Sequence, residues 1–404
     1  MKLPRFVQPP VTPTRSDIRI VVLTSILGFF EGHALAQAAN TLPFVRRSLD
    51  ITAADMSQLL GIVRLGAVVA VLLSLLGDRR GRRRVLLGAF VAMLVANAAT
   101  AIAPDVATFT ILQTVVRMTG SAVGALALVM LAESLTPALR AYGISIFGGA
   151  VSFGAGTALV LIPISDLGPE SWRFLYGASA LGLAFYPFVA LRLRESPLFV
   201  APSEPTALWS PLLDTQKRPF WIVAVLSFLS ATFSAPAATF AMERLVGDVG
   251  LRTPVAVGVL LAGGTLGGLG FLVGGRSSDL WGRRPVLFGA LLLAGVGGVG
   301  MFRLTEPAAL AAAAAISGFG AFATVPSLGA LRSELFPTRM RATAVMWLNV
   351  AGVLGAVTGL AAGSYLIGRF GLSTTITALA ACMLIAAGLV LAVPETRGRI
   401  LEPG

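Results

Sequence analysis

The sequence predicts an all-α integral membrane protein with twelve transmembrane helices in two pseudo-symmetric six-helix bundles. Three observations predict this fold: an apolar composition, twelve long apolar runs and a repeat half the chain long. Of the 404 residues, 56% are hydrophobic and 12% are charged, whereas soluble domains carry about 25% charged residues. Lipid must therefore cover much of the surface.

Each of the twelve apolar runs is long enough to cross the hydrocarbon core as a helix, which takes about 20 residues. Short segments with Pro, Gly or charged residues separate the runs. The predicted spans are 20–44, 56–77, 85–103, 107–131, 141–163, 172–192, 219–242, 254–275, 286–303, 308–332, 342–367 and 373–393. The predicted domains are an N-terminal tail 1–19, a bundle 20–192, a linker 193–218, a bundle 219–393 and a C-terminal tail 394–404.

The distribution of basic residues predicts the orientation in the membrane. Most of the 31 lysines and arginines lie in the two tails and in the loops on the same side as the tails. Lysine and arginine are enriched in cytoplasmic loops, so we expect both termini to be cytoplasmic and the protein to lie in the cell membrane. The net charge of +12 does not predict a nucleic-acid partner, because the basic residues form short clusters between apolar runs.

A repeat relates the two halves of the chain. The repeated residues follow the second and eighth spans and end the fourth and tenth. They are Asp78, Gly81, Arg82, Arg83, Glu133 and Arg140 and, 201 positions later, Asp279, Gly282, Arg283, Arg284, Glu334 and Arg341. Two motifs at one offset indicate a duplicated six-span unit.

These motifs carry a resemblance to a known family. Residues 78–83 and 279–284 resemble the signature of the major facilitator superfamily in the loops after helices 2 and 8, although Ser74 replaces the family's first glycine. Residues 333–341 resemble the helix 10–11 loop of metabolite–proton symporters, and residues 394–402 are similar to the C-terminal signature of sugar porters. The resemblance is to the metabolite–proton symporter and sugar porter-like branch.

The resemblance implies alternating access, with the repeated charges as a conformational latch at the cytoplasmic side. A carboxylate can bind a helix N-terminus, a glycine allows the turn, and arginines can pair with acids. The alternative is that the basic residues serve membrane insertion alone. The predicted latch residues are Asp78, Gly81, Arg82, Glu133, Arg140, Asp279, Gly282, Arg283, Glu334 and Arg341.

Ionisable residues inside the bilayer are costly and indicate functional sites. Glu31 lies roughly 16 Å from the start of its predicted span, near the midplane, and Arg117 lies at similar depth. In the proton-driven sugar porters that the chain resembles, a helix 1 acid pairs with a helix 4 arginine followed by glycines, as Arg117 is by Gly120 and Gly124. We predict proton coupling through Glu31 and Arg117; a static buried pair is the alternative.

Two more ionisable residues lie within the first two spans. If Arg64 faces the cavity, it supplies positive charge for an anionic substrate, and it is a predicted substrate-binding residue; it can instead extend to the membrane interface. His33 is two residues from Glu31 and points elsewhere on the helix. We expect a packed, hydrogen-bonded histidine there in preference to a proton carrier.

The second half places aromatic residues on its predicted cavity helices and no ionisable residue at comparable depth. An aromatic wall with one polar contact is typical of small-molecule sites, although aromatic stripes also serve packing alone. The substrate-binding residues predicted here are Phe233, Phe240, Phe319, Trp347 and Asn349.

The sequence thus predicts a secondary active transporter for a small organic metabolite, an organic anion, with proton symport. The alternative is a proton-driven exporter of a hydrophobic drug or secondary metabolite, and a transporter-like sensor also stays open. We expect no enzyme activity, cofactor or metal, because metal-ligand spacing, phosphate loops and nucleophile motifs are missing and Cys382 is the single cysteine. The expected partners are the substrate, the proton and lipid, and the expected state is a monomer.

Overall fold

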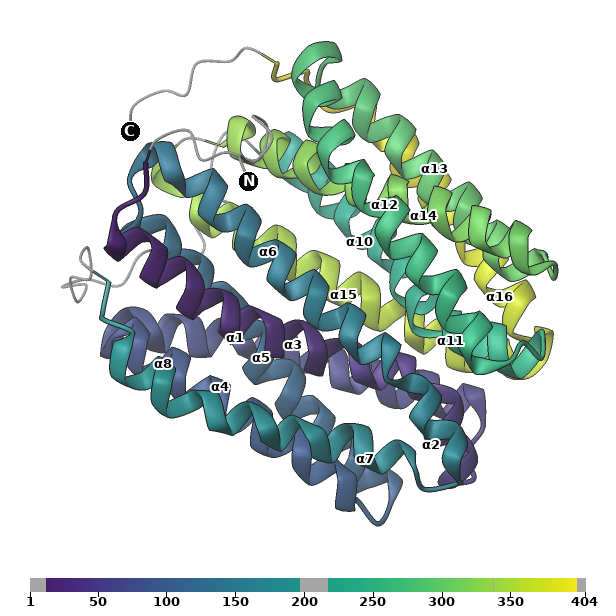
Figure 1. The fold of residues 1–404 in the computed structure, drawn as a ribbon. Helices are drawn as coiled ribbons and strands as arrows, with labels where there is room; N and C mark the ends of the chain where they lie inside the picture. Colours follow the sequence, from purple (N-terminus) through teal and green to yellow (C-terminus); the bar gives the residue numbers. More distant parts are fainter. Residues whose placement is uncertain (1–11, 197–216, 337, 398–404) are drawn as a thin grey trace. The chain divides into compact units, whose positions relative to one another are not determined.

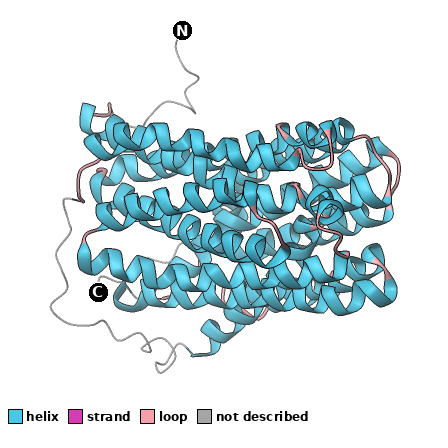
Figure 2. Cartoon of the chain, turned by 90° about the horizontal axis from the view of Figure 1, so that it is seen from below, coloured by secondary structure: helices cyan, strands magenta, loops and turns pink. Residues whose placement is uncertain are grey.

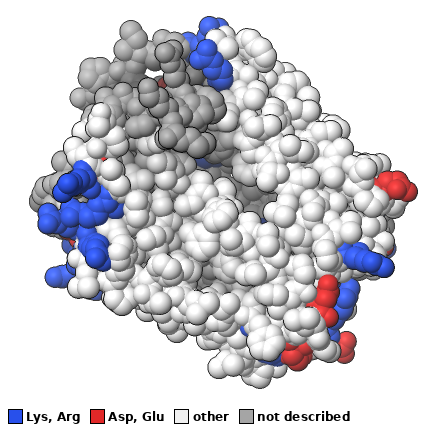
Figure 3. Space-filling model, viewed as in Figure 1, with Lys and Arg blue, Asp and Glu red and all other residues white. Residues whose placement is uncertain are grey.

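The computed structural model describes residues 12–196, 217–336 and 338–397. Within these ranges the regular structure is entirely helical (Figure 2). Twelve helical segments are long and apolar enough to cross a membrane, which confirms the predicted number of spans. On the face in Figure 3, charged side chains gather at the ends of the helices and leave an uncharged band between them.

The first six spans are formed by helices up to Arg192 (Figure 1). They are α1 (Arg15–Asn40), with the short α2 (Leu42–Ser48) after it, α3 (Ala53–Arg80), α4 (Arg82–Ala99), α5 (Val106–Ser134), α6 (Pro137–Val160), α7 (Trp172–Gly177) and α8 (Tyr186–Arg192). Short 3-10 turns continue three of these spans, at Thr100–Ile102, Ile162–Leu167 and Ala178–Phe185.

The last six spans begin at Lys217. They are α10 (Lys217–Thr239), followed by α11 (Ala241–Glu243) and a π-helical turn (Arg244–Asp248), then α12 (Thr253–Trp281), α13 (Arg283–Arg303), α14 (Pro307–Leu335), α15 (Thr338–Phe370), α16 (Leu372–Leu379) and α17 (Ala381–Val390).

Two helices run further than their apolar stretches. α3 continues to Arg80 and α12 to Trp281, beyond the predicted ends at 77 and 275. Each stops where the next residue is a glycine with positive φ, 98° at Gly81 and 107° at Gly282. Apolarity sets where a span can lie in lipid, but the left-handed glycine ends the helix.

The described chain forms two compact units. Unit 1 contains residues 12–38 and 66–196, and unit 2 contains residues 39–65 together with everything described from 217 onward. The predicted bundle 20–192 includes the segment 39–65, which packs with the second half of the chain instead. The predicted domain boundaries themselves stay a prediction.

In unit 1, α4 packs along α5, and α1 packs against α6 (Figure 1). A Cβ atom at Gly32 would overlap the carbonyl of Val151, and one at Gly154 would overlap the carbonyl of Phe29. Small residues allow such backbone contact between membrane helices. These two glycines fix α1, which carries Glu31, against α6.

Buried amides tie α1 to α4 and α5. The Asn97 side-chain amide donates to Gln37 Oε1 and to Ser179 Oγ, the latter at 2.6 Å. Gln113 Nε2 donates to Asn97 Oδ1 at 3.3 Å and to Thr100 Oγ1 at 2.9 Å. Polar groups in hydrocarbon must be bonded within the protein, so this network holds together the helices that carry Glu31 and Arg117.

In unit 2, α14 packs along α12 and α13, and α10 packs along α15. The segment 39–65 joins this unit through polar contacts. Arg46 Nη2 pairs with Glu243 Oε1 at 2.6 Å, and Ser57 Oγ donates to the Leu360 carbonyl oxygen at 2.7 Å. Glu243 is 3% exposed, so removing Arg46 would leave a buried carboxylate without its cation.

Candidate functional site

Glu31 lies in α1 with 8% of its surface exposed. Its carboxylate packs against Gly124 of α5, where a Cβ atom would overlap Oε1. The other oxygen, Oε2, is buried and has no hydrogen-bond partner among the described residues. A carboxyl group in this setting is poorly solvated in its charged form.

Arg117 lies seven residues before Gly124 on α5, and therefore two turns along the same helix face. It acts electrostatically on Glu31. The ion pairs found between described residues do not include these two side chains. The predicted coupling residues thus share one environment in unit 1, with the glycine rather than the arginine in direct contact with the acid.

His33 is buried, and its Nδ1 lies 3.1 Å from Thr157 Oγ1 on α6. Its ring also stacks on Phe29. This is the packed, hydrogen-bonded histidine that the sequence analysis favoured.

Arg64 lies on the part of α3 that belongs to unit 2. Its Nη2 donates to Thr239 Oγ1 at the end of α10, at 3.2 Å. Glu31 belongs to unit 1, so the role of Arg64 beside that acid stays a prediction.

Unit 2 contains an apolar cavity of about 300 Å³ between α10, α12, α13, α14 and α17. Phe233 and Phe322 line it, together with Met301, and Ser234 and Ser317 supply its polar side chains. Of the substrate-binding residues predicted in the second half, Phe233 alone lines this cavity. Phe240 is fully buried elsewhere, and Phe319 and Trp347 are not among the lining residues.

Asn349 contacts an arginine that sequence reasoning passed over. Arg332 Nη1 donates to Asn349 Oδ1 at 3.1 Å, and Arg332 Nη2 donates to Ser227 Oγ at 2.7 Å. The sequence placed Arg332 at the very end of a predicted span and gave it no role. Because α14 continues to Leu335, the arginine lies inside the helix and beside α10 and α15.

The first charged cluster, formed by Gly81, Arg82, Arg83, Glu133, Glu195 and Ser196, lies where α3 ends and α4 begins. Arg82 pairs with Glu133 of α5, and Ser196 also binds Glu133. Glu195 accepts the backbone N–H of Arg83 at 3.1 Å, at the start of α4. The cluster therefore links the end of the sixth span to the start of α4 and to the end of α5.

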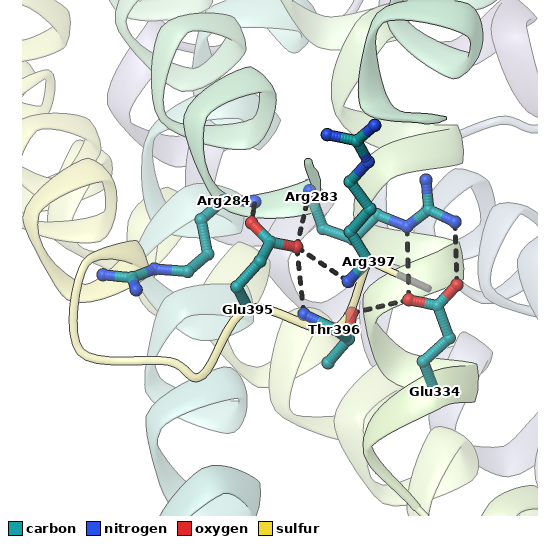
Figure 4. A network of polar contacts seen from close by, with 6 residues as sticks. All are labelled: Arg283, Arg284, Glu334, Glu395, Thr396 and Arg397. Carbon is teal, nitrogen blue, oxygen red and sulfur yellow. Dashed lines mark hydrogen bonds and ion pairs between the residues drawn. The ribbon is translucent and has the colours of Figure 1, made fainter. Parts of the chain in front are cut away.

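The second charged cluster, formed by Gly282, Arg283, Arg284, Glu334, Glu395 and Thr396, repeats this pattern between α12 and α13 (Figure 4). Arg283 binds Glu334 of α14 through Nη2 at 2.8 Å and Nε at 3.2 Å. Glu395 accepts the backbone N–H groups of Arg283 and Arg284 at 2.9 and 3.1 Å, and Thr396 donates to Glu334.

Both helix-ending glycines face these glutamates. A Cβ atom would lie 2.8 Å from Glu195 Oε2 at Gly81, and 2.7 Å from Glu395 Oε2 at Gly282. Partial burial disfavours the charged form of Glu395, but backbone N–H donors from Arg283, Arg284, Arg397 and Thr396 outweigh it and lower the pKa of this carboxyl below its ordinary value. Glu395 thus binds the N-terminus of α13 as an anion.

The structure brings together six of the ten predicted latch residues, namely Gly81, Arg82, Glu133, Gly282, Arg283 and Glu334. The side chains of Asp78, Arg140, Asp279 and Arg341 lie outside the described side chains. Sequence reasoning missed Glu195 and the repeat of Glu195-Ser196 as Glu395-Thr396. That repeat has an offset of 200 rather than 201, and a search that allowed one residue of slip would have found it.

Among the described residues, no group of three or more His, Cys, Asp or Glu side chains could hold a metal ion. Twelve spans, matching charged clusters in two halves and a buried acid in a spanning helix define a multi-pass membrane transporter. The chain belongs to the Major Facilitator Superfamily, whose family model matches residues 24–276 and 220–403. The family predicted from the loop motifs is thereby confirmed.

The chain is 26% identical to the 3-(3-hydroxy-phenyl)propionate transporter of Escherichia coli (strain K12), over 96% of this chain and 98% of that protein. Its fold is similar to a D-xylose-proton symporter, with a TM-score of 0.79 and 18% identity over 96% of this chain and 100% of that one. It is also similar to the human organic anion transporter MFSD10, with a TM-score of 0.68 and 16% identity over 95% and 100% of the two chains.

Proposed function

We propose that the chain moves a small organic acid, of the aromatic carboxylate class, across the cell membrane by alternating access with proton symport. The observation that carries the proposal is Glu31, a buried acid against Gly124 with one oxygen unbonded within the described chain. Protonation removes the cost of burying its charge and ends its attraction to Arg117. The name of the Escherichia coli relative suggests the substrate class.

In this proposal Glu31 carries the proton and Arg117 sets its affinity for it. Arg64 and the residues Phe233, Phe240, Phe319, Trp347 and Asn349 remain the proposed substrate contacts. The two charged clusters form the latch, on the cytoplasmic side with both termini. The protein acts as a monomer.

The test uses purified protein in proteoliposomes with an imposed proton gradient and labelled 3-(3-hydroxyphenyl)propionate. Wild type should accumulate the acid when the gradient is imposed. Glu31→Gln should lose accumulation and keep counterflow exchange, because the amide cannot release a proton. Glu306→Gln, a change at an exposed acid, is the matched control and should behave as wild type. Full accumulation by Glu31→Gln would reject proton coupling through this residue.

A second candidate is proton-driven export of a hydrophobic compound. The largely apolar cavity of unit 2, with two serines as its polar side chains, favours it, because such a lining suits uncharged ligands. Vesicles loaded with a neutral aromatic dye distinguish the two functions. Proton-driven dye release without uptake of the acid would support export.

A further inference from the structure

Arg332 occupies an unusual position in unit 2. It lies on α14, and its guanidinium reaches Ser227 on α10 at 2.7 Å and Asn349 on α15 at 3.1 Å. Three spanning helices thus meet at one cation. Both partners are neutral oxygen acceptors, so they orient the guanidinium without balancing its charge.

Three other arginines of the structure differ in this respect. Arg82, Arg283 and Arg46 each pair with a glutamate, whereas no ion pair between described residues includes Arg332. Glu334, two residues further on, points to another face of α14 and binds Arg283. Partial burial of a cation among neutral neighbours is unfavourable, and an anion bound beside it would offset that cost.

The guanidinium also has donors to spare. Arginine has five N–H donors, and the two contacts above use one on each terminal nitrogen. The buried Nε has no hydrogen-bond partner among the described residues. Asn349 is exposed, so the described protein does not cover the site on the Asn349 side. The free donors form the planar fork that binds a carboxylate at two points.

We propose that Arg332 binds the carboxylate of the transported acid, while Ser227 and the substrate contact Asn349 hold its guanidinium toward the ligand. This inference rests on the proposed function and names the residue that recognises the anionic group. The ligand class is a small monocarboxylate whose apolar part needs no charge partner of its own.

The experiment measures ligand binding by thermal shift of the full-length protein in neutral, lipid-free detergent. The probes are benzoate, 3-phenylpropionate and 3-(3-hydroxyphenyl)propionate, each beside its uncharged amide. Wild type should bind at least one carboxylate more tightly than its amide. Arg332→Gln should weaken carboxylate binding about 10- to 100-fold, the usual effect of losing a charged hydrogen bond, and change amide binding about twofold or less. Arg332→Lys should bind the carboxylate more weakly than wild type and more tightly than Arg332→Gln.

The variants separate recognition from a structural role. Arg332→Gln removes a cation without an acidic partner, so its melting temperature should equal or exceed that of wild type. A lower melting temperature with equal losses for acid and amide would show a structural tie and overturn the inference. Ser227→Ala and Asn349→Ala should weaken carboxylate binding less than Arg332→Gln. Arg303→Gln is the matched control, because Arg303 is exposed and donates to Thr377.

The remaining outcomes distinguish failure of the Arg332 inference from failure of the proposed function. If wild type binds a carboxylate and Arg332→Gln binds it equally well, the inference fails and organic-acid transport stands. If wild type binds none of the three carboxylates, both the substrate class and the inference are rejected. Phosphatidylglycerol could instead raise the melting temperature of wild type and not that of Arg332→Gln, while no carboxylate raises either. Arg332 would then bind a lipid phosphate, and the inference would be overturned.

Discussion

The two units are alike where their spans end and different in their interiors. Each charged cluster has an arginine–glutamate pair, a positive-φ glycine and a second glutamate on a helix N-terminus. Inside, unit 1 holds an acid against Gly124, and unit 2 holds an arginine among neutral partners beside an apolar cavity. The two units thus share the contacts that end their helices and differ in the interior residues available to a ligand.

The largest expected effect comes from a glycine-to-alanine substitution inside each unit, which adds one methyl group to its interior. Gly124→Ala places a Cβ in the space of the Glu31 carboxylate, whereas Cβ at Gly264, beside the unit 2 cavity, has no atom within 4 Å. Gly124→Ala should destabilise unit 1 by about 1 to 3 kcal/mol through overpacking and impair proton-driven accumulation. Gly264→Ala should be neutral or stabilising, since Ala favours helices over Gly by about 1 kcal/mol.

Thermal unfolding and proteoliposome uptake of both variants check this prediction. Equal melting temperatures for the two variants would show that the interiors tolerate a methyl group equally, and the contrast between the units would fail at this point.

A smaller effect tests the likeness of the two clusters. Gly81→Ala and Gly282→Ala each force a side chain into positive φ, which costs about 1 to 2 kcal/mol, and push it against Glu195 or Glu395. Both variants should lower the melting temperature by similar amounts. Gly88→Ala, at a helical glycine with open space around it, is the control. A loss at one glycine alone would show that the clusters have diverged.

The smallest expected effect is a pH dependence in the second cluster. The pKa of Glu395 lies below its ordinary value of 4.5, so its stabilising contribution is complete above about pH 4.5 and is lost as the pH falls through the folded-state pKa. Glu395→Gln should be less stable than wild type at pH 7, and the difference should shrink in more acidic buffer. A difference that grew on acidification would contradict the assigned sign.

The sequence was sufficient for the fold because lipid imposes helix length and internal hydrogen bonding on each span. It could not locate helix ends, since α3 and α12 stop at glycines rather than at the first charge. It brought Glu31 and Arg117 together through a family resemblance, yet the direct contact of Glu31 is Gly124. The sequence does not indicate which side chain packs against a given glycine.

Arg332 shows a second limit. Whether an arginine near the end of a span is a loop charge or part of a site depends on its neighbours, here Ser227 and Asn349 from two other helices. Ser227 and Asn349 lie 105 and 17 positions from Arg332 and share no motif with it, so only packing reveals the group. The same holds for Arg46 and Glu243, which lie 197 positions apart.

The segment 39–65 has a mechanical consequence for a transporter. The chain passes from unit 1 to unit 2 within α1 and returns within α3, so both crossings are continuous helix and neither is a flexible linker. Any displacement of one unit against the other must bend these two helices or detach the hairpin from its contacts at Glu243 and Leu360. The hairpin of residues 39–65 therefore couples the shape of α1 and α3 to any movement between the two units.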